Sequence, residues 1–234
     1  MFKIPIETDF DVLDFFSFGE TALFIDAGAN RGETVRAIRM KYPRNKVLAF
    51  EPNPIIFEKT KRSFRRDEST TFVNVGLSDK DEEWELKIPF YKKYMFDGLA
   101  SFKEDEALDW LRTRIYFFSE KNLELRRVKC KLKTLDGFDV NPEFIKIDVQ
   151  GYEMRVLWGA KQTIKRNLPV LLIETPTQEV SDYLKGLGYW PFQFDGSAGL
   201  LPGFGRLNTF FINESSPVYR RIPKEEADAP PTMK

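Results

Sequence analysis

Four residues with regular spacing stand at the end of the first apolar stretch of the chain. Residues 26–32 read Asp-Ala-Gly-Ala-Asn-Arg-Gly, so that Asp26, Gly28, Asn30 and Gly32 are spaced D-x-G-x-N-x-G. Glycines at a turn between a strand and a helix let a ligand approach the amides at the start of the helix. A dinucleotide-binding turn would read G-x-G-x-x-G, with a glycine where this chain has Asn30. Asp26 would repel a diphosphate, so the turn favours a ligand with an ammonium group; the alternative is a purely structural turn.

A second group of candidates follows the next two apolar stretches. Glu51 ends the second of these, 19 positions after the last glycine of the turn, where nucleotide-binding α/β folds place an acid on the ribose hydroxyls. The alternative is an acid ahead of a helix that begins near residue 54, although Asn53 is better placed to cap it. After the third stretch, Leu77 could cover a purine and Ser78 or Asp79 could hydrogen-bond to it, whereas an ordinary turn would have the same sequence pattern.

Two charged residues interrupt an otherwise apolar stretch at residues 144–149. Strand alternation places Lys146 and Asp148 on one side and the two isoleucines on the other. Buried charges are costly unless they are paired, so a functional role is favoured over chance. Glu174 ends the next apolar stretch and adds a carboxylate at the same edge. Glu153 falls in the first turn of the following helix, where a favourable helix-dipole interaction explains it equally well.

These residues must be positioned by an α/β fold with a mostly parallel sheet and helices on both faces, because apolar stretches alternate with segments of helical period. Strands are expected at residues 22–27, 46–51, 71–75, 144–149, 169–174, 189–194 and 208–212, with an additional strand at 81–88. Open α/β sheets bind ligands at the carboxyl ends of their strands, so Asp26 and Glu51 should face one crevice.

The chain is expected to divide into three parts. Residues 1–20 form an N-terminal cap segment, residues 21–214 the main domain and residues 215–234 a flexible tail. Residues 89–125 break the regular rhythm and hold many aromatics, which is typical of an acceptor-binding lid or of aromatics packed on a sheet edge. A basic stretch at 121–133 holds six cations and one acid, and a solvated strand edge explains it better than an anionic ligand does.

Composition narrows the chemistry further. The chain has no histidine, which removes the usual neutral-pH base, the Ser-His and Cys-His pairs and every His-based metal site. Its single cysteine, Cys130, excludes an intramolecular disulfide. The 36 basic and 36 acidic residues cancel, which argues against a nucleic-acid partner. We find no membrane span and no signal-peptide layout, so a cytoplasmic protein is expected.

Together these segments resemble the FkbM family of S-adenosylmethionine (SAM)-dependent methyltransferases. The resemblance rests on FIDAGANRGET, AFEPNP, NVGLSD, TLDGF, FIKIDVQGYEMRVLWGA and LPVLLIE, in family order over about residues 23–174. It implies a Rossmann-like class I methyltransferase fold, with a seven-stranded, mostly parallel sheet. It also implies SAM contacted by Asp26, Gly28, Asn30 and Glu51, and O-methylation, often of sugar hydroxyls in glycans and natural products. The further candidates for contact with the cofactor are Gly32, Asn53, Leu77 and Ser78. Arg31 departs from the apolar residue usual at its position.

The expected mechanism is transfer of a methyl group to a hydroxyl on a small molecule or glycan. Without histidine the base should be a carboxylate, so Asp148 is expected to be the base or to position the acceptor, with Lys146 orienting it or stabilising the developing alkoxide. Glu174 joins them as a catalytic candidate, and Asp148 is also expected to contact the cofactor. We predict no metal, although an all-oxygen Mg²⁺ site at Asp148 and Glu174 remains an alternative. The rival functions are a NAD-type oxidoreductase and a non-catalytic SAM-binding protein.

Overall fold

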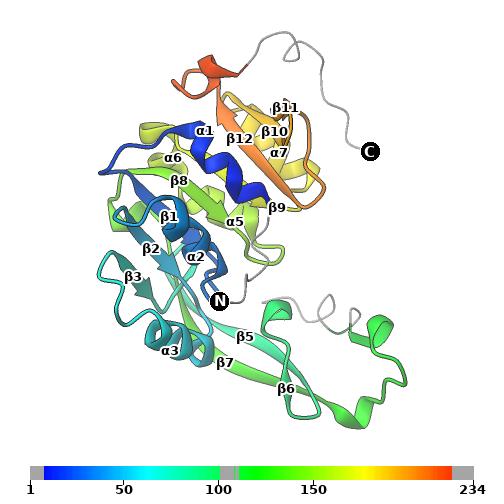
Figure 1. Cartoon of the computed structure of the whole chain (residues 1–234). Helices are drawn as coiled ribbons and strands as arrows, with labels where there is room; N and C mark the ends of the chain where they lie inside the picture. Colours follow the sequence, from blue (N-terminus) through cyan, green and yellow to red (C-terminus); the bar gives the residue numbers. More distant parts are fainter. Residues whose placement is uncertain (1–7, 101–107, 109–110, 223–234) are drawn as a thin grey trace.

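The computed structural model describes residues 8–100, 108 and 111–222, and within them eight strands form one sheet in the order β11-β10-β12-β9-β8-β1-β2-β3 (Figure 1). The strands from β3 to β9 in this order run parallel, and β12 pairs antiparallel with both β9 and β10. The strands of this sheet are β1 (Leu23–Ala27), β2 (Lys46–Phe50), β3 (Thr70–Val73), β8 (Pro142–Ile147), β9 (Val170–Glu174), β10 (Tyr189–Asp195), β11 (Gly199–Pro202) and β12 (Asn208–Asn213).

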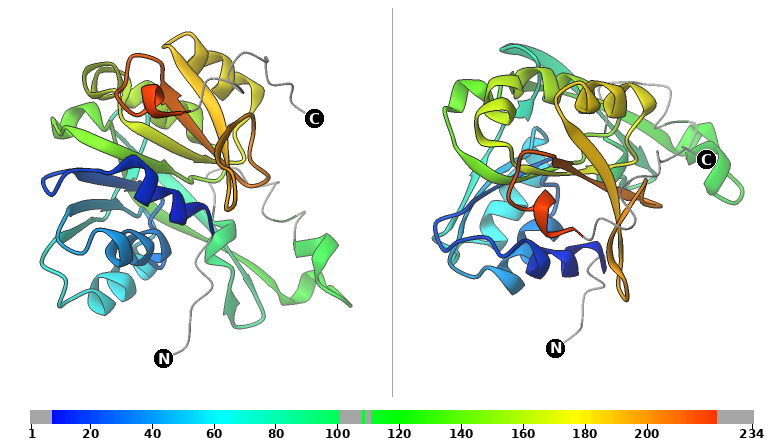
Figure 2. Two further views of the ribbon diagram at one scale, coloured as in Figure 1. Left: turned by 45° about the horizontal axis from the view of Figure 1, so that its top comes forward. Right: turned by 90° about the horizontal axis from the view of Figure 1, so that it is seen from above.

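Helices cover both faces of this sheet, which buries the apolar strands on both sides (Figure 2). One face packs under α1 and α2, where Leu13, Phe16 and Ile38 belong to one buried cluster. The other packs under α5, α6 and α7, where Leu157 and Leu184 belong to a second cluster. The helices are α1 (Leu13–Phe16), α2 (Glu33–Lys41), α3 (Pro54–Ser63), α5 (Glu153–Gly159), α6 (Lys161–Asn167) and α7 (Gln178–Lys185).

A second sheet, four-stranded in the described part of the chain, has the order β4-β7-β5-β6. Its strands are β4 (Gly76–Leu77), β5 (Glu82–Tyr91), β6 (Tyr94–Met95) and β7 (Leu123–Lys133). The long β5–β7 ribbon projects away from the main sheet in Figure 1. Arg155 on α5 anchors the base of this ribbon, because its guanidinium contacts Asp79 at 3.4 Å and Glu82 at 3.2 Å and lies over the ring of Trp84.

The α/β prediction is confirmed, but the expected count of seven strands is wrong. The structure adds β11, which forms a hairpin with β10 through the turn at residues 196–198. With four residues, β11 is too short to show strand alternation in the sequence. Regular secondary structure also continues past residue 89, since β5 extends to Tyr91, which pairs with Leu123. Residues 101–107 and 109–110 of the predicted lid lie outside the described residues, so the lid stays a prediction.

The two ends of the domain pack more closely than the sequence suggested. Phe10, Leu13 and Phe16 of the predicted cap segment are buried in the same cluster as Ile222 near the other end of the described chain. Arg221 donates a hydrogen bond from Nη1 to the carbonyl oxygen of Phe16 at 3.2 Å. Residues 215–222 of the predicted flexible tail thus include a buried apolar side chain, that of Ile222, and the flexibility of the tail stays a prediction. Residues 223–234 lie outside the described residues.

Helix α5 packs closely against the loop after β4 at a glycine, and this contact gives a prediction for stability. A Cβ at Gly159, the last residue of α5, would lie 1.8 Å from the carbonyl oxygen of Ser78, just after β4. Gly159→Ala should therefore lower the free energy of unfolding by about 1–3 kcal/mol, because helix and loop must separate. Urea titration measures this. Gly196→Ala is the matched control, since a Cβ there would meet no atom within 4 Å, and an equal loss in both variants would contradict the contact.

Candidate active site at the carboxyl edge of the sheet

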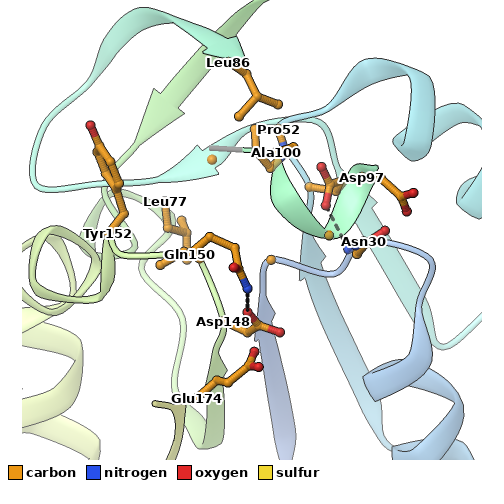
Figure 3. Close-up of a pocket in the computed structure, with 15 residues that line it drawn as sticks. Asn30, Pro52, Leu77, Leu86, Asp97, Ala100, Asp148, Gln150, Tyr152 and Glu174 are labelled. Carbon is orange, nitrogen blue, oxygen red and sulfur yellow. Dashed lines mark hydrogen bonds between the residues drawn. The ribbon is translucent and has the colours of Figure 1, made fainter. Parts of the chain in front are cut away.

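A cleft of about 300 Å³ opens where β1, β2, β8 and β9 end (Figure 3). It therefore lies at the edge where open α/β sheets bind ligands. Its walls come from the strand ends and from the second sheet. It is lined by Gly28, Asn30, Glu51, Pro52, Gly76, Leu77, Leu86, Asp97, Gly98, Ala100, Asp148, Val149, Gln150, Tyr152 and Glu174.

Asp26 lies beneath this cleft on β1 and is fully buried. The strand register places it directly opposite Lys146 of β8. Neither of its carboxylate oxygens has a hydrogen-bond partner of good geometry among the described residues, and the Thr34 side chain is only a minor influence that lowers its pKa. Burial raises the pKa of Asp26 to about 7, although the charge of Lys146 lowers it; Asp148 and Glu33 raise it further. The single positive charge of Lys146 therefore does not offset the burial of this carboxylate together with its acidic neighbours.

Gly28 is required by the close approach of two strand ends. Its φ of 92° lies in the left-handed region, and a Cβ would lie 1.8 Å from the carbonyl oxygen of Asp148. The amides of Gly28 and Ala29 donate to the carbonyl oxygen of Phe50 at 3.0 and 2.9 Å. The first glycine of the motif therefore brings β1, β2 and β8 together at the cleft as well as lining it.

Glu51 connects the loops that follow β1 and β2. Its carboxylate accepts hydrogen bonds from the amide of Asn30 at 2.8 Å and from the amide of Asn53 at 2.7 Å. Burial nevertheless raises its pKa to about 7, with these two hydrogen bonds acting in the opposite direction. A carboxylate has about four acceptor positions, so two remain for a ligand at the cleft. The side-chain oxygen of Asn30 is also buried there without a partner among the described residues.

Lys146 and Asp148 form an ion pair at the floor of the cleft, with 3.0 Å between Nζ and Oδ2. Gln150 donates to the other oxygen, Oδ1, at 2.9 Å. Only 6% of the Lys146 side chain is exposed, against 25% for Asp148, so the carboxylate faces the cleft and the ammonium lies behind it. The structure thus pairs the two charged residues that strand alternation placed on one side of the strand.

Asp148 also meets Glu174 at the end of β9, and Figure 3 shows the two carboxyl groups pointing toward one another. Burial favours the neutral form of Asp148. The positive charge of Lys146 and the hydrogen bonds with Glu174, Lys146 and Gln150 have the larger, opposite effect, so the pKa of Asp148 lies below its usual value. The pKa of Lys146 is raised, because Asp148 and Asp26 overcome the effect of its burial. The floor of the cleft therefore holds an ionised carboxylate and a charged lysine.

The family model for the methyltransferase FkbM domain matches residues 26–190, which include every residue that lines the cleft. The chain belongs to the FkbM methyltransferase family. It is 24% identical over 183 residues to methyltransferase sdnD of Sordaria araneosa, covering 69% of each chain. It is 26% identical over 169 residues to methyltransferase 1 of Beauveria bassiana, covering 67% of this chain and 64% of that one.

The fold is also similar to that of a solved FkbM methyltransferase from Methylobacillus flagellatus. The TM-score is 0.58 at 17% identity, over 89% of this chain and 48% of that one. The chain therefore spans about half of that protein and about two thirds of the two curated relatives. The likeness confirms the class I methyltransferase fold that the sequence implied.

Several residues predicted to bind the cofactor do not line the cleft of this FkbM chain. A Cβ at Gly32 would lie 2.5 Å from the ring of Phe64, so this glycine serves packing between α2 and α3. Asn53 caps α3, with its side-chain oxygen accepting from the amide of Ile55. Ser78 is fully buried, and its hydroxyl bonds to Asp79. Gly28, Asn30, Glu51, Leu77, Asp148 and Glu174 do line it.

Sequence reasoning missed Asp97, Gly98 and Ala100, which enter the cleft from the second sheet. Asp97 begins a short 3-10 turn, η2 (Asp97–Leu99), and carries a bidentate ion pair with Arg31. Only the departure of Arg31 from the family pattern hinted at this contact.

Among the described residues, no group of three or more acids or cysteines is arranged to hold a metal ion. No described helix is long and apolar enough to span a bilayer.

The raised pKa values of Asp26 and Glu51 predict how the stability of the ligand-free protein depends on pH. The folded state keeps a proton on each acid up to about pH 7, whereas the unfolded chain releases it near pH 4. The folded state therefore binds more protons in this window, and the free energy of unfolding should fall as pH rises from about 4 to 7.

Asp26→Asn removes one of these titrations and should flatten the dependence. Urea titrations from pH 5 to 8 measure the slope. Asp139→Asn serves as the control, because the side chain of Asp139 is 89% exposed. An Asp26→Asn variant with the same slope as the unmodified protein would show that Asp26 is ionised throughout.

Proposed function

We propose that the chain is a SAM-dependent O-methyltransferase that acts on a hydroxylated small molecule or glycan. The observation that carries this proposal is the shortage of positive charge at the cleft. Glu51, Asp97, Asp148 and Glu174 line it, no basic residue is among its described lining residues, and Asp26 lies buried beneath it. A cationic ligand would complement this charge distribution.

SAM fits this requirement, because its sulfonium and ammonium groups exceed its single carboxylate by one charge. Asp26 and Glu51 would supply the negative charge that its cationic groups need, and Glu51 keeps acceptor positions for ribose hydroxyls. Asn30 offers an unpaired side-chain oxygen, while Leu77 offers an apolar wall for the adenine ring. When bound, SAM would supply an electrophilic methyl group, so neither a nucleophilic triad nor a zinc ion is needed.

In the proposed reaction, Asp148 orients the acceptor hydroxyl and takes its proton. A carboxylate held ionised accepts a hydrogen bond at any pH near neutrality, and the hydroxyl proton becomes strongly acidic once the oxygen forms a third bond. Lys146 lies 3.0 Å behind this carboxylate and keeps it charged. Glu174 and Gln150 hold it in place. Alignment of the two reactants would supply much of the rate enhancement.

The same acids favour an acceptor that is neutral or cationic at its reacting end. A phosphate or uronate group would meet up to four carboxylates at short range. The basic stretch on β7 does not offset them, because its cations face acids on neighbouring positions. Lys133 pairs with Asp81, Arg126 with Glu124, and Lys129 lies opposite Glu85.

The oxidoreductase alternative would place a pyrophosphate beside these carboxylates and has no supporting cation in the described lining.

Two experiments test the proposal together. Thermal-shift titrations compare SAM, S-adenosylhomocysteine and NAD, and incubation with methyl-labelled SAM screens neutral, amino and acidic sugars, polyols and RNA. Stabilisation by NAD without stabilisation by SAM would overturn it. SAM binding with no labelled product from any acceptor would favour the non-catalytic alternative. A cytoplasmic location stays a prediction.

Cofactor affinity should rise with pH. Asp26 and Glu51 are partly protonated near pH 7 in the free protein, and a cation favours their ionised forms. The Kd for SAM should therefore fall between pH 6 and 8 and level off above, with protons released on binding. Calorimetry in two buffers of different ionisation enthalpy measures the release. If no protons are released near pH 6.5, the proposed role of these acids is contradicted. The Asp26→Asn variant should release fewer protons than the unmodified protein.

Asp148→Asn should lower kcat by about 100-fold or more, because an amide cannot take the proton. The Kd for S-adenosylhomocysteine should change less than roughly tenfold, since one of several acids is neutralised. Single-turnover methyl transfer and calorimetry separate the two effects. Asp139→Asn is again the exposed control. Normal turnover of Asp148→Asn with saturating cofactor would rule out the proposed role.

A further inference from the structure

The contact between Arg31 and Asp97 joins two walls of the cleft that are 66 positions apart in the chain. Arg31 lies in the loop between β1 and α2, directly after Asn30. Asp97 begins η2, the 3-10 turn that follows β6 of the second sheet. The guanidinium donates from Nε to Oδ2 at 2.7 Å and from Nη2 to Oδ1 at 2.8 Å. Such a bidentate pair fixes orientation as well as distance.

The burial of the two partners is unequal, which shows where the pair acts. The Asp97 side chain is only 10% exposed and lines the cleft, whereas the Arg31 side chain is 60% exposed. The exposed Arg31 side chain therefore binds, from the solvent side, a carboxylate that lines the cleft. Without it, Asp97 would remain as a mostly buried carboxylate beside Glu51, whose pKa it already raises.

The η2 turn is attached firmly on its other side. The amide of Phe96 donates to the carbonyl oxygen of Pro89 on β5 at 2.9 Å, and the amide of Ala100 closes the turn on the carbonyl oxygen of Asp97 at 3.1 Å. Gly98 and Ala100 of this segment line the cleft. The position of this wall relative to the β1–α2 loop therefore depends on the ion pair.

We propose that Arg31 and Asp97 are positioning residues that hold the η2 turn against the β1–α2 loop and so retain the cofactor in the cleft. This inference rests on the proposed function, since the retained ligand is SAM or its product. An open wall would let the ligand leave faster without changing the groups that carry out methyl transfer. The pair should therefore affect the dissociation rate of the bound ligand and the KM for SAM.

The test is a charge-swap series: Asp97→Asn, Arg31→Met, the double variant and the reversed pair R31D/D97R. The dissociation rate of S-adenosylhomocysteine, measured by surface plasmon resonance, should rise roughly 3–10-fold in each single variant. The double variant should be no worse than the single ones, because both break the same contact. The reversed pair should recover a substantial part of the loss. Glu124→Gln is the matched control, since Glu124 forms a bidentate pair with Arg126 on the same ribbon, outside the cleft lining.

Hydrogen exchange of the ligand-free protein gives a readout that needs no cofactor. Amides of residues 96–100 should lose protection in both single variants and regain it in R31D/D97R. Unchanged protection would show that the pair does not hold the turn, and the proposal falls. Lost protection with an unchanged dissociation rate would overturn retention. If the unmodified protein fails to bind S-adenosylhomocysteine, the proposed function fails and retention with it, while exchange still decides whether the pair holds the turn.

Discussion

The site depends on one buried cation placed between two acids. Lys146 faces Asp26 across the β1–β8 register and contacts Asp148 at 3.0 Å, with all three groups largely removed from water. One ammonium cannot compensate two buried carboxylates fully, so the charge is shared unevenly. Asp148 remains ionised, and the pKa of Asp26 rises to about 7. The fold therefore carries an electrostatic deficit at the edge of its sheet, which is costly to stability and useful only if a cation occupies the cleft.

Backbone packing at the same edge makes this arrangement rigid. Gly28 lies against the carbonyl oxygen of Asp148, and the turn that contains it bonds to the end of β2 through Phe50. Glu51 then links the two loops through the amides of Asn30 and Asn53. A ligand at the cleft thus meets backbone and carboxylates already in place, and little conformational entropy is lost when they contact it.

The sequence predicted the parts of the site that local patterns encode. Asp26, Glu51, Lys146 and Asp148 could be found because each breaks or ends an apolar strand, and parallel strands bring such ends together. Asn53 and Ser78 do not line the cleft, since Asn53 caps α3 and Ser78 is buried in a turn. A helix cap and a buried turn use the same residue types as a ligand contact, so the sequence alone does not separate them. Asp97 lies within the segment 89–125 that was predicted as a possible lid, but the residue itself could not be singled out, since its contact depends on how distant parts of the chain meet in the fold. The β11 hairpin was missed for a similar reason, because too few residues form it to establish a period.

The formal net charge of zero hides an uneven distribution of acidic and basic residues, which only the tertiary structure produces. On the β5–β7 ribbon, basic residues stand opposite or beside acids, so Lys129, Lys131 and Lys133 lie near Glu85, Glu83 and Asp81. At the cleft the acids gather without that compensation, and the nearest cations are held by Asp148 and Asp97. Histidine would titrate near neutrality within such a field and add a charge that depends on pH. A site built from carboxylates, one buried lysine and one arginine keeps its negative charge above pH 7, and a cation lowers the pKa values of Asp26 and Glu51 as it binds.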